Sequence, residues 1–255
     1  FNGNDQVAGV QLSLALNRKT RKVDIGIRVS DMPGPDIALQ APVLAWLSVV
    51  DAPISGSMRT QVDADGVVNS FAGTFDIEAG ALRPDQNTPP VAFQSAKAYF
   101  TFDPERQRID FSEVSFVAED GELLASGHSY LAELDGPWPR AFLGQFQVES
   151  AAFDGGDVFA GPVALANLSA DLRLRLDPFS IEIPQIAIDN EGTPIAASAL
   201  IEARNEGWHA SVDATTPMIT SAQVLAFWPR AVAPITRGWL SNNLRAGTLH
   251  QTSAA

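Results

Sequence analysis

The stretch Leu168-Ser-Ala-Asp-Leu-Arg-Leu-Arg-Leu-Asp-Pro178 alternates apolar and polar residues over eleven positions without a break. Successive side chains of a β-strand point to opposite faces, so this alternation predicts a strand with one buried face. The polar face would carry Ser169, Asp171, Arg173 and Arg175. Pro178 lacks the N–H group that a sheet needs, so the strand is expected to end at Asp177-Pro178.

The same period-two alternation recurs on both sides of this stretch. The apolar positions are Leu12, Leu14, Leu16, Val23, Ile25, Ile27 and Val29 near the start, and Ile181, Ile183, Ile186, Ile188, Ile195, Ala197, Ala199, Ile201, Trp208, Ala210, Val212 and Ala214 after it. Polar segments at 17–20, 189–192 and 204–207 separate these runs and are typical of turns. The sequence therefore predicts a mainly β protein built from antiparallel hairpins.

The chain also shows an internal repeat of about 70 residues. Residues 75–139 can be laid over residues 146–209, which places Asp103-Pro104 on Asp177-Pro178 and Trp138 on Trp208. We expect two β-meander repeats within one continuous structural domain. The segments are 1–74 (hairpin, helix and start of the sheet), 75–145 (first repeat), 146–219 (second repeat) and 220–255 (helix pair and a following strand). Repeated meanders give a sheet with one apolar face, which must be covered, folded over or filled.

Two short helices are expected beside this sheet. Pro42–Ser48 and Pro234–Ser241 both begin with Pro and carry a Trp-Leu-Ser sequence, and strands are expected to open after them at Gly56 and Gly247. An earlier helix should begin at Thr220, where Thr220-Ser-Ala-Gln223 has a capping-box pattern, and break at Pro229. The two helices that begin with Pro are predicted to be amphipathic.

Composition excludes several classes of protein. The 255 residues carry a formal charge of −13, which disfavours binding to nucleic acid or to anionic lipid over the whole chain. There is no Cys, so disulfides and thiolate metal sites are absent. No apolar run reaches the roughly 20 residues that span a bilayer. Because the chain starts without Met and stops within a pattern, we expect it to be a piece of a longer protein.

No motif for catalysis stands out. His128, His209 and His250 are scattered singly, and the sequence contains no phosphate loop and no nucleophile elbow. Asp154–Asp157 could offer carboxylates to calcium, but a turn is the better interpretation because calcium needs six to eight oxygen ligands. We therefore predict no catalytic residue, metal or cofactor. A hydrolase is disfavoured, because spacing alone places no two carboxylates together.

The C-terminal segment differs in charge from the rest. Residues 214–255 contain no Asp or Glu but include Arg230, Arg237 and Arg245. Trp228 and Trp239 lie beside them, so Trp228, Arg230, Arg237 and Trp239 are candidates for contact with a membrane interface or a neighbouring module. Alternatively, the aromatic residues cover the end of the sheet and the Arg side chains are solvated.

The apolar face of the predicted sheet is itself a candidate site. In a β-sandwich it would be dry core. In a sheet curled into a trough, acyl chains could fill the space that side chains leave, because aliphatic tails need apolar area and no hydrogen bonds. The candidate residues for such a groove are Leu168, Leu172, Leu174, Leu176, Ile181, Ile183, Ile186, Ile188, Ile109 and Phe111.

The segment 227–249 resembles the AsmA-like family, in the proteins of the YhdP type. It carries Trp228-Pro229, the pattern Pro-x-x-Arg-x-Trp-Leu from Pro234, and Asn-Leu-x-x-Gly ending at Gly247. The earlier Trp46-Leu-Ser48, followed by Ala52–Gly56, is similar to the segment that leads into the sheet of those proteins. The motif-bearing part covers about 25 residues.

This resemblance implies a fold, a location and a function. It implies an extended, curled antiparallel sheet with an open groove, in the periplasmic part of a large bacterial protein anchored in the inner membrane outside this segment. It also implies a non-enzymatic role in carrying phospholipid between inner and outer membrane, which supports outer-membrane integrity. The partners would be acyl chains and flanking repeats, and membrane contact would lie outside this segment. The alternative is a structural or adhesive β-sandwich that binds protein or glycan.

Overall fold

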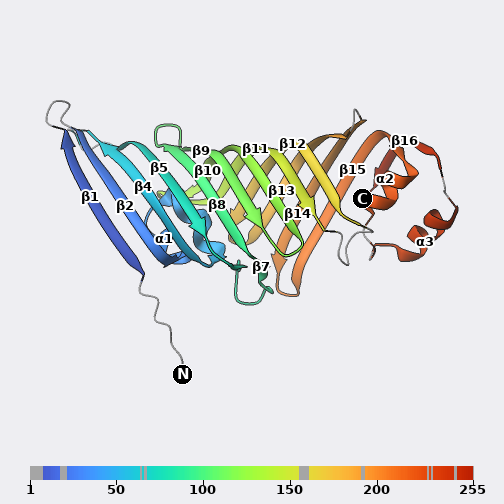
Figure 1. Cartoon of the computed structure of the whole chain (residues 1–255), viewed down its shortest axis with the longest axis horizontal. Helices are drawn as coiled ribbons and strands as arrows, with labels where there is room; N and C mark the ends of the chain where they lie inside the picture. The colour runs from blue at the N-terminus through green and yellow to red at the C-terminus, as the bar shows by residue number, and fades with distance from the viewer. Residues whose placement is uncertain are drawn as a thin grey trace, which may run out of the picture.

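A computed structural model describes residues 8–17, 22–63, 65, 68–154, 161–190, 193–228, 230, 232–243 and 246–254. These residues form a mainly β structure with one open, antiparallel sheet of thirteen strands and a second sheet of three (Figure 1). The coarse prediction of a β protein built from antiparallel hairpins is confirmed.

The large sheet follows the chain order. Its strands are β1 (Gly9–Asn17), β2 (Lys22–Pro33), β4 (Pro53–Val62), β5 (Val68–Ile77), β8 (Ser95–Asp103), β9 (Arg108–Val117), β10 (Gly121–Asp135), β11 (Trp138–Phe153), β12 (Val163–Leu176), β13 (Phe179–Asn190), β14 (Thr193–Arg204), β15 (Gly207–Thr220) and β16 (Thr248–Ala254). Every neighbouring pair is antiparallel. Most connections are therefore short hairpin turns.

Three longer connections carry the remaining elements. Between β2 and β4 lie α1 (Gly34–Ala38), the 3-10 helix η1 (Pro42–Val49) and β3 (Val50–Asp51). Between β5 and β8 lie β6 (Gly80–Leu82) and β7 (Val91–Phe93), and between β15 and β16 lie α2 (Ser221–Phe227) and α3 (Pro234–Asn243). β3, β6 and β7 form the small sheet. Since β2, β5 and β15 all run in the same direction, all three connections leave the large sheet at the same end of its strands.

One face of the large sheet is called the inner face here, because η1 packs on it. Its side chains include Phe75, Phe100 and Phe142, which share one hydrophobic cluster with Leu44 and Leu47 of η1. Trp46 adds ring contacts to β5 and β9, with centroid distances of 6.5 Å to Phe75 and 6.1 Å to Phe111. The packed core of the molecule therefore lies between η1 and the inner face, mostly on the strands from β2 to β11, and it reaches Phe179 of β13.

The helix at Pro42 differs from the expectation of an amphipathic helix. η1 is a 3-10 helix, and Val43, Leu44, Ala45, Leu47 and Val49, five of its eight residues, are buried. Because it is apolar on most sides, it fits between α1, β3 and the inner face, and it has no wide solvent face. The strands of the large sheet that follow η1 and α3 begin at Pro53 and Thr248, close to the predicted Gly56 and Gly247.

The large sheet bends strongly, so that β13, β14 and β15 pass behind the earlier strands and cross them in Figure 1. Hydrogen bonds join parts of the chain that are far apart in sequence. The indole Nε1 of Trp208 in β15 donates to the carbonyl of Pro89 at 2.7 Å, and Thr88 Oγ1 donates to the carbonyl of Arg204 at 3.5 Å. The segment between β6 and β7 thus holds the β14–β15 turn near the small sheet.

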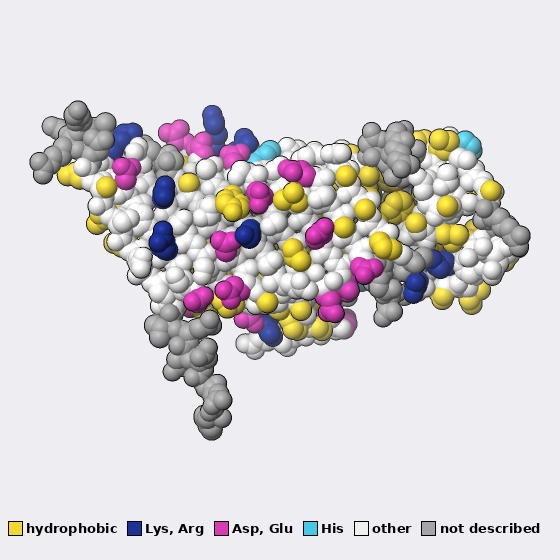
Figure 2. Space-filling model, in the orientation of Figure 1, with side chains coloured by type: hydrophobic (Ala, Val, Ile, Leu, Met, Phe, Trp, Pro, Cys, Tyr) yellow, Lys and Arg dark blue, Asp and Glu magenta, His cyan; other side chains and the backbone are white. Residues whose placement is uncertain are grey.

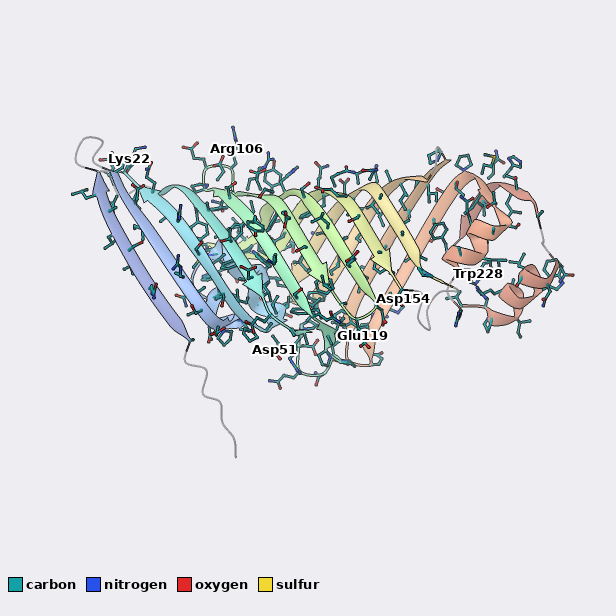
Figure 3. All side chains as sticks on the ribbon, viewed as in Figure 1. Lys22, Asp51, Arg106, Glu119, Asp154 and Trp228 are labelled. Atoms are coloured by element: carbon teal, nitrogen blue, oxygen red, sulfur yellow. The ribbon has the colours of Figure 1, made fainter. Side chains whose placement is uncertain are left out.

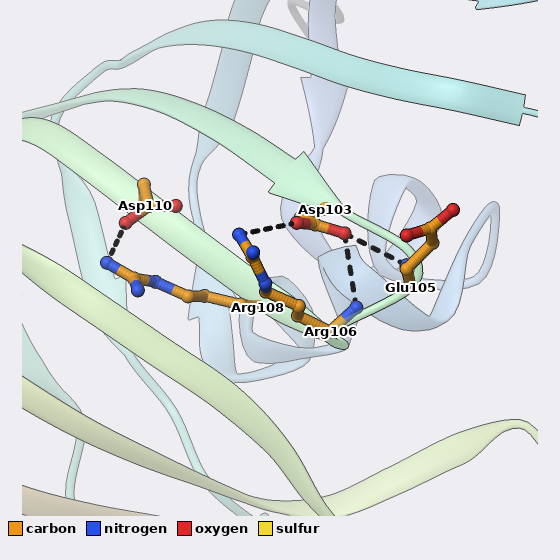
Figure 4. Close-up of polar contacts among 5 residues, drawn as sticks. All are labelled: Asp103, Glu105, Arg106, Arg108 and Asp110. Carbon is orange, nitrogen blue, oxygen red and sulfur yellow. Dashed lines mark hydrogen bonds and ion pairs between the residues drawn. The ribbon is translucent and has the colours of Figure 1, made fainter.

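Several predicted turns and caps are confirmed. Between β8 and β9, the Asp103 carboxylate accepts hydrogen bonds from the backbone N–H groups of Glu105 (3.0 Å) and Arg106 (3.1 Å) (Figure 4). Asp177-Pro178 connects β12 to β13, and Arg204–Gly207 connects β14 to β15. Thr220 and Gln223 form the predicted capping box at the start of α2.

Some predictions fall on positions outside the described residues. These positions include 18–20 of the first turn, 155–157 after Asp154, 191–192 of the second turn, Pro229 and Arg245. The predicted boundaries at 74/75 and 145/146 fall inside β5 and β11, and the sheet is continuous across them. The β6–β7 excursion has no counterpart between 146 and 219 in the described chain, so the repeat stays a prediction.

Candidate functional site

The inner face continues beyond η1 onto β12, β13, β14 and β15, where it is only half covered. Register places apolar residues opposite one another across these strands: Leu174 faces Ile181, which faces Ile201, which faces Ala210. The uncovered face, as we call it, consists of Leu172, Leu174, Leu176, Ile181, Ile183, Ile186, Ile188, Ile195, Ala197, Ala199, Ile201, Ala210, Val212 and Ala214. All of them are partly or largely exposed, and Val212 reaches 57%. Solvent therefore reaches an aliphatic surface that is continuous with the core.

The spacing Ile183-Pro-Gln-Ile186 keeps both isoleucines on the uncovered face. Ile183 pairs with Ala199 of β14, and Ile186 pairs with Ala197. The two residues between the isoleucines on β13 therefore lie opposite one residue of β14, Ser198, so β13 has one extra residue there. Such a bulge restores the alternation after a three-residue step, and Pro184 is tolerated at it. Ile181, Ile183, Ile186 and Ile188 consequently share one side of β13, as the sequence predicts.

Side-chain size changes across the uncovered face. Ile186 of β13 faces Ala197 of β14, which faces Ala214 of β15, and Ile183 likewise faces Ala199. Alanine fills much less of the space above a sheet than isoleucine does. At these positions the side chains on β14 and β15 are therefore shorter than those on β13.

The chemistry of this face is limited to apolar contact. None of its fourteen residues carries a charge, a hydroxyl or an amide. Such a surface gains free energy by removing hydrocarbon from water, at roughly 25 cal/mol per Å². It offers a ligand no side-chain hydrogen bond that would fix its orientation, so it suits aliphatic groups of no specific shape.

The inner face is also uncovered at the other end of the sheet. Val10, Leu12, Leu14 and Leu16 of β1 are between 59% and 65% exposed. They pair with Val29, Ile27, Ile25 and Val23 of β2, and Val29 and Ile27 belong to the core around η1. The packed middle of the inner face thus has an exposed aliphatic extension on each side.

Three predicted groove residues lie in packed surroundings. Ile109 is 0% exposed and belongs to the core beneath η1, and Phe111 lies against Trp46. Leu168 is buried in a smaller cluster with Ala125 and Val148. Among the other seven candidates, Leu174, Leu176 and Ile181 are partly buried against the core that contains Ile109, and Ile186 and Ile188 are partly buried against the cluster of Leu168.

The outer face of the same strands is polar. Glu133 of β10 accepts hydrogen bonds from the guanidinium groups of Arg173 and Arg175 on β12. Hydrogen bonds from Arg175 and then Arg173 lower the pKa of the Glu133 carboxyl below its ordinary value. Figure 2 shows scattered acidic and basic side chains on the visible face of the strands. Arg173 and Arg175 thus lie on the opposite side of β12 from Leu172, Leu174 and Leu176.

Sequence reasoning did not find a hollow of about 840 Å³ on the outer face between β12 and β16. One row of small residues across five strands forms its floor: Ser169, Ala187, Ala196, Thr215 and Ser253. In the sequence, each of these strands carries a small residue on its outer, mostly polar face. Whether the five small residues line up in one row depends on the pairing register of the strands, which the sequence does not show. The hollow is open and uncharged.

The α2–α3 segment positions the four candidate interface residues. Arg237 donates hydrogen bonds to the carbonyls of Trp228 (3.3 Å) and Leu225 (3.2 Å), and Trp228 Nε1 donates to the carbonyl of Val232 (2.7 Å). Arg237 and Trp228 therefore hold the turn between the helices; Figure 3 labels Trp228 there. Trp239 is 60% exposed, and Arg230 is exposed at the surface.

Within the described part of the chain, no group of three or more His, Asp or Glu residues could hold a metal ion. His128 lies edge-on to Tyr130, with ring centroids 5.5 Å apart, and both are on the outer face of β10. None of the described helices is long and apolar enough to cross a membrane.

Comparison with known proteins identifies no relative. No protein-family model matches the chain, and no match was found among curated proteins or among solved structures.

Proposed function

We propose that this chain is a non-enzymatic lipid-binding segment, in which a curled, open sheet holds phospholipid acyl chains against the uncovered face. The observation that supports this most is the set of fourteen solvent-accessible aliphatic residues on β12–β15, with no polar side chain among them. Acyl chains gain free energy on leaving water and need no hydrogen-bond partner. The headgroup stays in solvent.

The direction of the aliphatic rows suits transfer as well as binding. The rows run across successive strands, so a tail that lies on Ile186 and Ala197 has similar contacts on the neighbouring strands. Apolar contacts are non-directional, and a tail can therefore slide from one meander to the next without breaking hydrogen bonds. In this proposal the chain lies in the periplasm as part of an inner-membrane-anchored protein, and flanking repeats extend the groove toward the outer membrane.

The alternative is a dry-cored β-sandwich module that binds protein or glycan through its surface. The packed half of the molecule beneath η1 agrees with a dry core. In the described part of the chain, however, the strands form one sheet of thirteen and one of three. No second large sheet among them covers β12–β15, so the lipid proposal accounts for the exposed aliphatic residues better.

The proposal is tested by lipid capture with a pair of matched variants. Delipidated protein is incubated with fluorescent phospholipid, separated from free lipid, and compared with an unrelated β-sandwich of similar size. Ile183→Glu puts a carboxylate on the uncovered face, and we expect capture to fall about tenfold, equivalent to about 1.4 kcal/mol. Ala187→Glu puts the same group on the outer face of the same strand, and capture should be retained.

Two results would count against lipid binding. One is capture by the wild-type chain no higher than by the β-sandwich, together with native mass spectra free of copurified lipid. The other is an equal loss in both Glu variants, which would indicate a general effect of charge or folding. Urea unfolding of both variants separates a lost site from a lost fold.

A further inference from the structure

The outer face carries a second, smaller hollow of about 370 Å³ between β10 and β13. Tyr130 of β10 and Arg173 of β12 both lie opposite Leu143 of β11, and Glu182 of β13 lies opposite Arg173. Residues that are directly opposite in an antiparallel pair point to the same face, so these side chains form one row across the hollow. Its volume is within the range of about 300–1,000 Å³ that is usual for small-molecule sites.

Tyr130 gives the hollow an aromatic wall that a ligand can reach, since this residue is 39% exposed. Two contacts hold its ring in place. His128 lies edge-on to it, with ring centroids 5.5 Å apart, and the guanidinium group of Arg108 on β9 lies 5.9 Å from the ring centroid. A ring that is already held loses little conformational entropy when a ligand binds. The negative face of such a ring attracts the partly positive C–H groups of an apolar ligand surface.

A second row on the same face supplies polar groups. Gln145 of β11 lies opposite both His128 of β10 and Asp171 of β12. Gln145 Nε2 donates a hydrogen bond to Asp171 Oδ1 at 3.0 Å, which orients both side chains. Within the described part of the chain, Gln145 Oε1 and Asp171 Oδ2 accept no hydrogen bond. These two oxygens can therefore accept hydrogen bonds from a ligand in the hollow.

The charges around the hollow favour a neutral ligand. Arg173 already donates to Glu133, and one of its guanidinium nitrogens lies 4.0 Å from a carboxylate oxygen of Glu182. Asp171 and Glu182 would repel an anion, and Arg173 would repel a cation. A hydroxyl group is both a donor and an acceptor, so it can pair with carboxylate, amide and guanidinium groups alike. Sugars combine several hydroxyl groups with an apolar C–H surface, and they match both rows.

We propose that this hollow binds a neutral carbohydrate, with one sugar ring stacked on Tyr130 and its hydroxyl groups hydrogen-bonded to Gln145 and Asp171. The site lies on the outer face, whereas Leu172 and Leu174 of the uncovered face lie on the other side of β12. Carbohydrate binding is therefore independent of lipid binding, and neither proposal requires the other.

Isothermal titration with cellotriose, maltotriose and triacetylchitotriose tests the proposal, because all three sugars are neutral. We expect at least one of them to bind the wild-type chain with a Kd on the order of 1 mM or lower. Saturation-transfer NMR with the same sugar should show the strongest transfer to the C–H protons of one ring, since that ring would lie against Tyr130.

Two matched pairs of variants locate the site. Tyr130→Ala should weaken binding about tenfold, because the stacking surface is lost. Tyr99→Ala is its control, since Tyr99 of β8 is 38% exposed and does not border the hollow. Gln145→Ala should weaken binding about fivefold through the lost hydrogen bonds. Gln147→Ala, two residues further along the same face of β11, should leave the Kd unchanged.

Three results would each overturn the proposal: no binding of any of the three sugars, an equal loss in the two Tyr variants, or an equal loss in the two Gln variants. The Gln pair keeps the test decisive if urea unfolding shows that Tyr130→Ala is poorly folded. Lipid capture by Gln145→Ala should equal that of the wild-type chain, so failure of the carbohydrate site and failure of the lipid site can be told apart.

Discussion

Glu133 shows how a single residue organises the polar side of the sheet. Its carboxylate lies across from Arg173 and Arg175, and Arg175 Nη2 is 3.0 Å from Oε1. Glu133 itself has a φ of 51°, and its neighbours Ala132 and Leu134 pair with Ala141 and Pro139 of β11. The two Arg side chains therefore fix an otherwise unusual backbone position near the end of β10.

The Glu133 pairing predicts a pH-dependent effect on stability. Because the folded-state pKa of Glu133 lies below its ordinary value of 4.5, its stabilising effect is present above that pH and is lost as the pH falls through the folded-state pKa. Glu133→Gln should lower the urea midpoint slightly at pH 7 and lower it by less at pH 3. Equal midpoint shifts at both pH values would contradict the ion pairing.

Among single residues, the sequence was most informative where alternation was regular. The seven candidates from Leu172 to Ile188 do share one side of β12 and β13. Ile109 and Phe111 follow the same pattern, yet η1 covers them. Alternation reports which face a residue is on, and it holds no information about what lies above that face, because the covering segment comes from more than sixty positions away in the chain.

At the scale of elements, α1 depends on a glycine where the chain passes close to itself. A Cβ on Gly34 would lie 2.3 Å from the carbonyl oxygen of Val50, which is backbone and cannot move aside cheaply. Gly34→Ala should therefore lower the free energy of unfolding by about 1–3 kcal/mol. Gly161→Ala is the matched control, since nothing lies within 4 Å of its Cβ position. Urea denaturation measures the free energy of unfolding of both variants. Equal free energies for the two variants would show that the backbone near α1 can move to accommodate the added methyl group.

Helices were predictable where their caps are local. The capping box of Thr220 and Gln223 is contained in four residues, and α2 begins where it indicates. The geometry of η1 could not be obtained in the same way. Pro42–Val49 is apolar on most sides, so its pattern does not distinguish a surface helix from a buried 3-10 turn, and only its contacts with β5 and β9 decide.

At the scale of the whole molecule, the contact between Trp208 and Pro89 helps to hold the bend of the sheet. Trp208→Phe keeps an aromatic ring against Phe179, now 5.8 Å from the Trp208 ring, but removes the indole hydrogen bond. We expect the free energy of unfolding to fall by about 0.5–1.5 kcal/mol. Small-angle scattering should show a more extended particle if the bend opens. Unchanged stability would mean that the bend is held by the packing around η1 alone.

The bend itself was beyond the reach of sequence patterns. Hairpin turns and strand lengths predict a meander, and the meander is present from β8 to β15. Curvature arises from the accumulated twist, the bulges at Ala125 and Ile183, and the segment at Thr88 that reaches the β14–β15 turn. Each contribution is small and depends on register, so the alternation of apolar and polar residues does not predict the curvature.

The uninterrupted meander has a consequence for how such a chain can change over evolutionary time. Gain or loss of a whole hairpin, for example β13 with β14, leaves every remaining neighbour antiparallel. Loss of one strand would demand a parallel pair and a crossover of a dozen or more residues. Duplications and deletions of two strands at a time can therefore lengthen or shorten the sheet, so the extent of its apolar face can be inherited in whole-hairpin steps while the flanking segments keep their orientation.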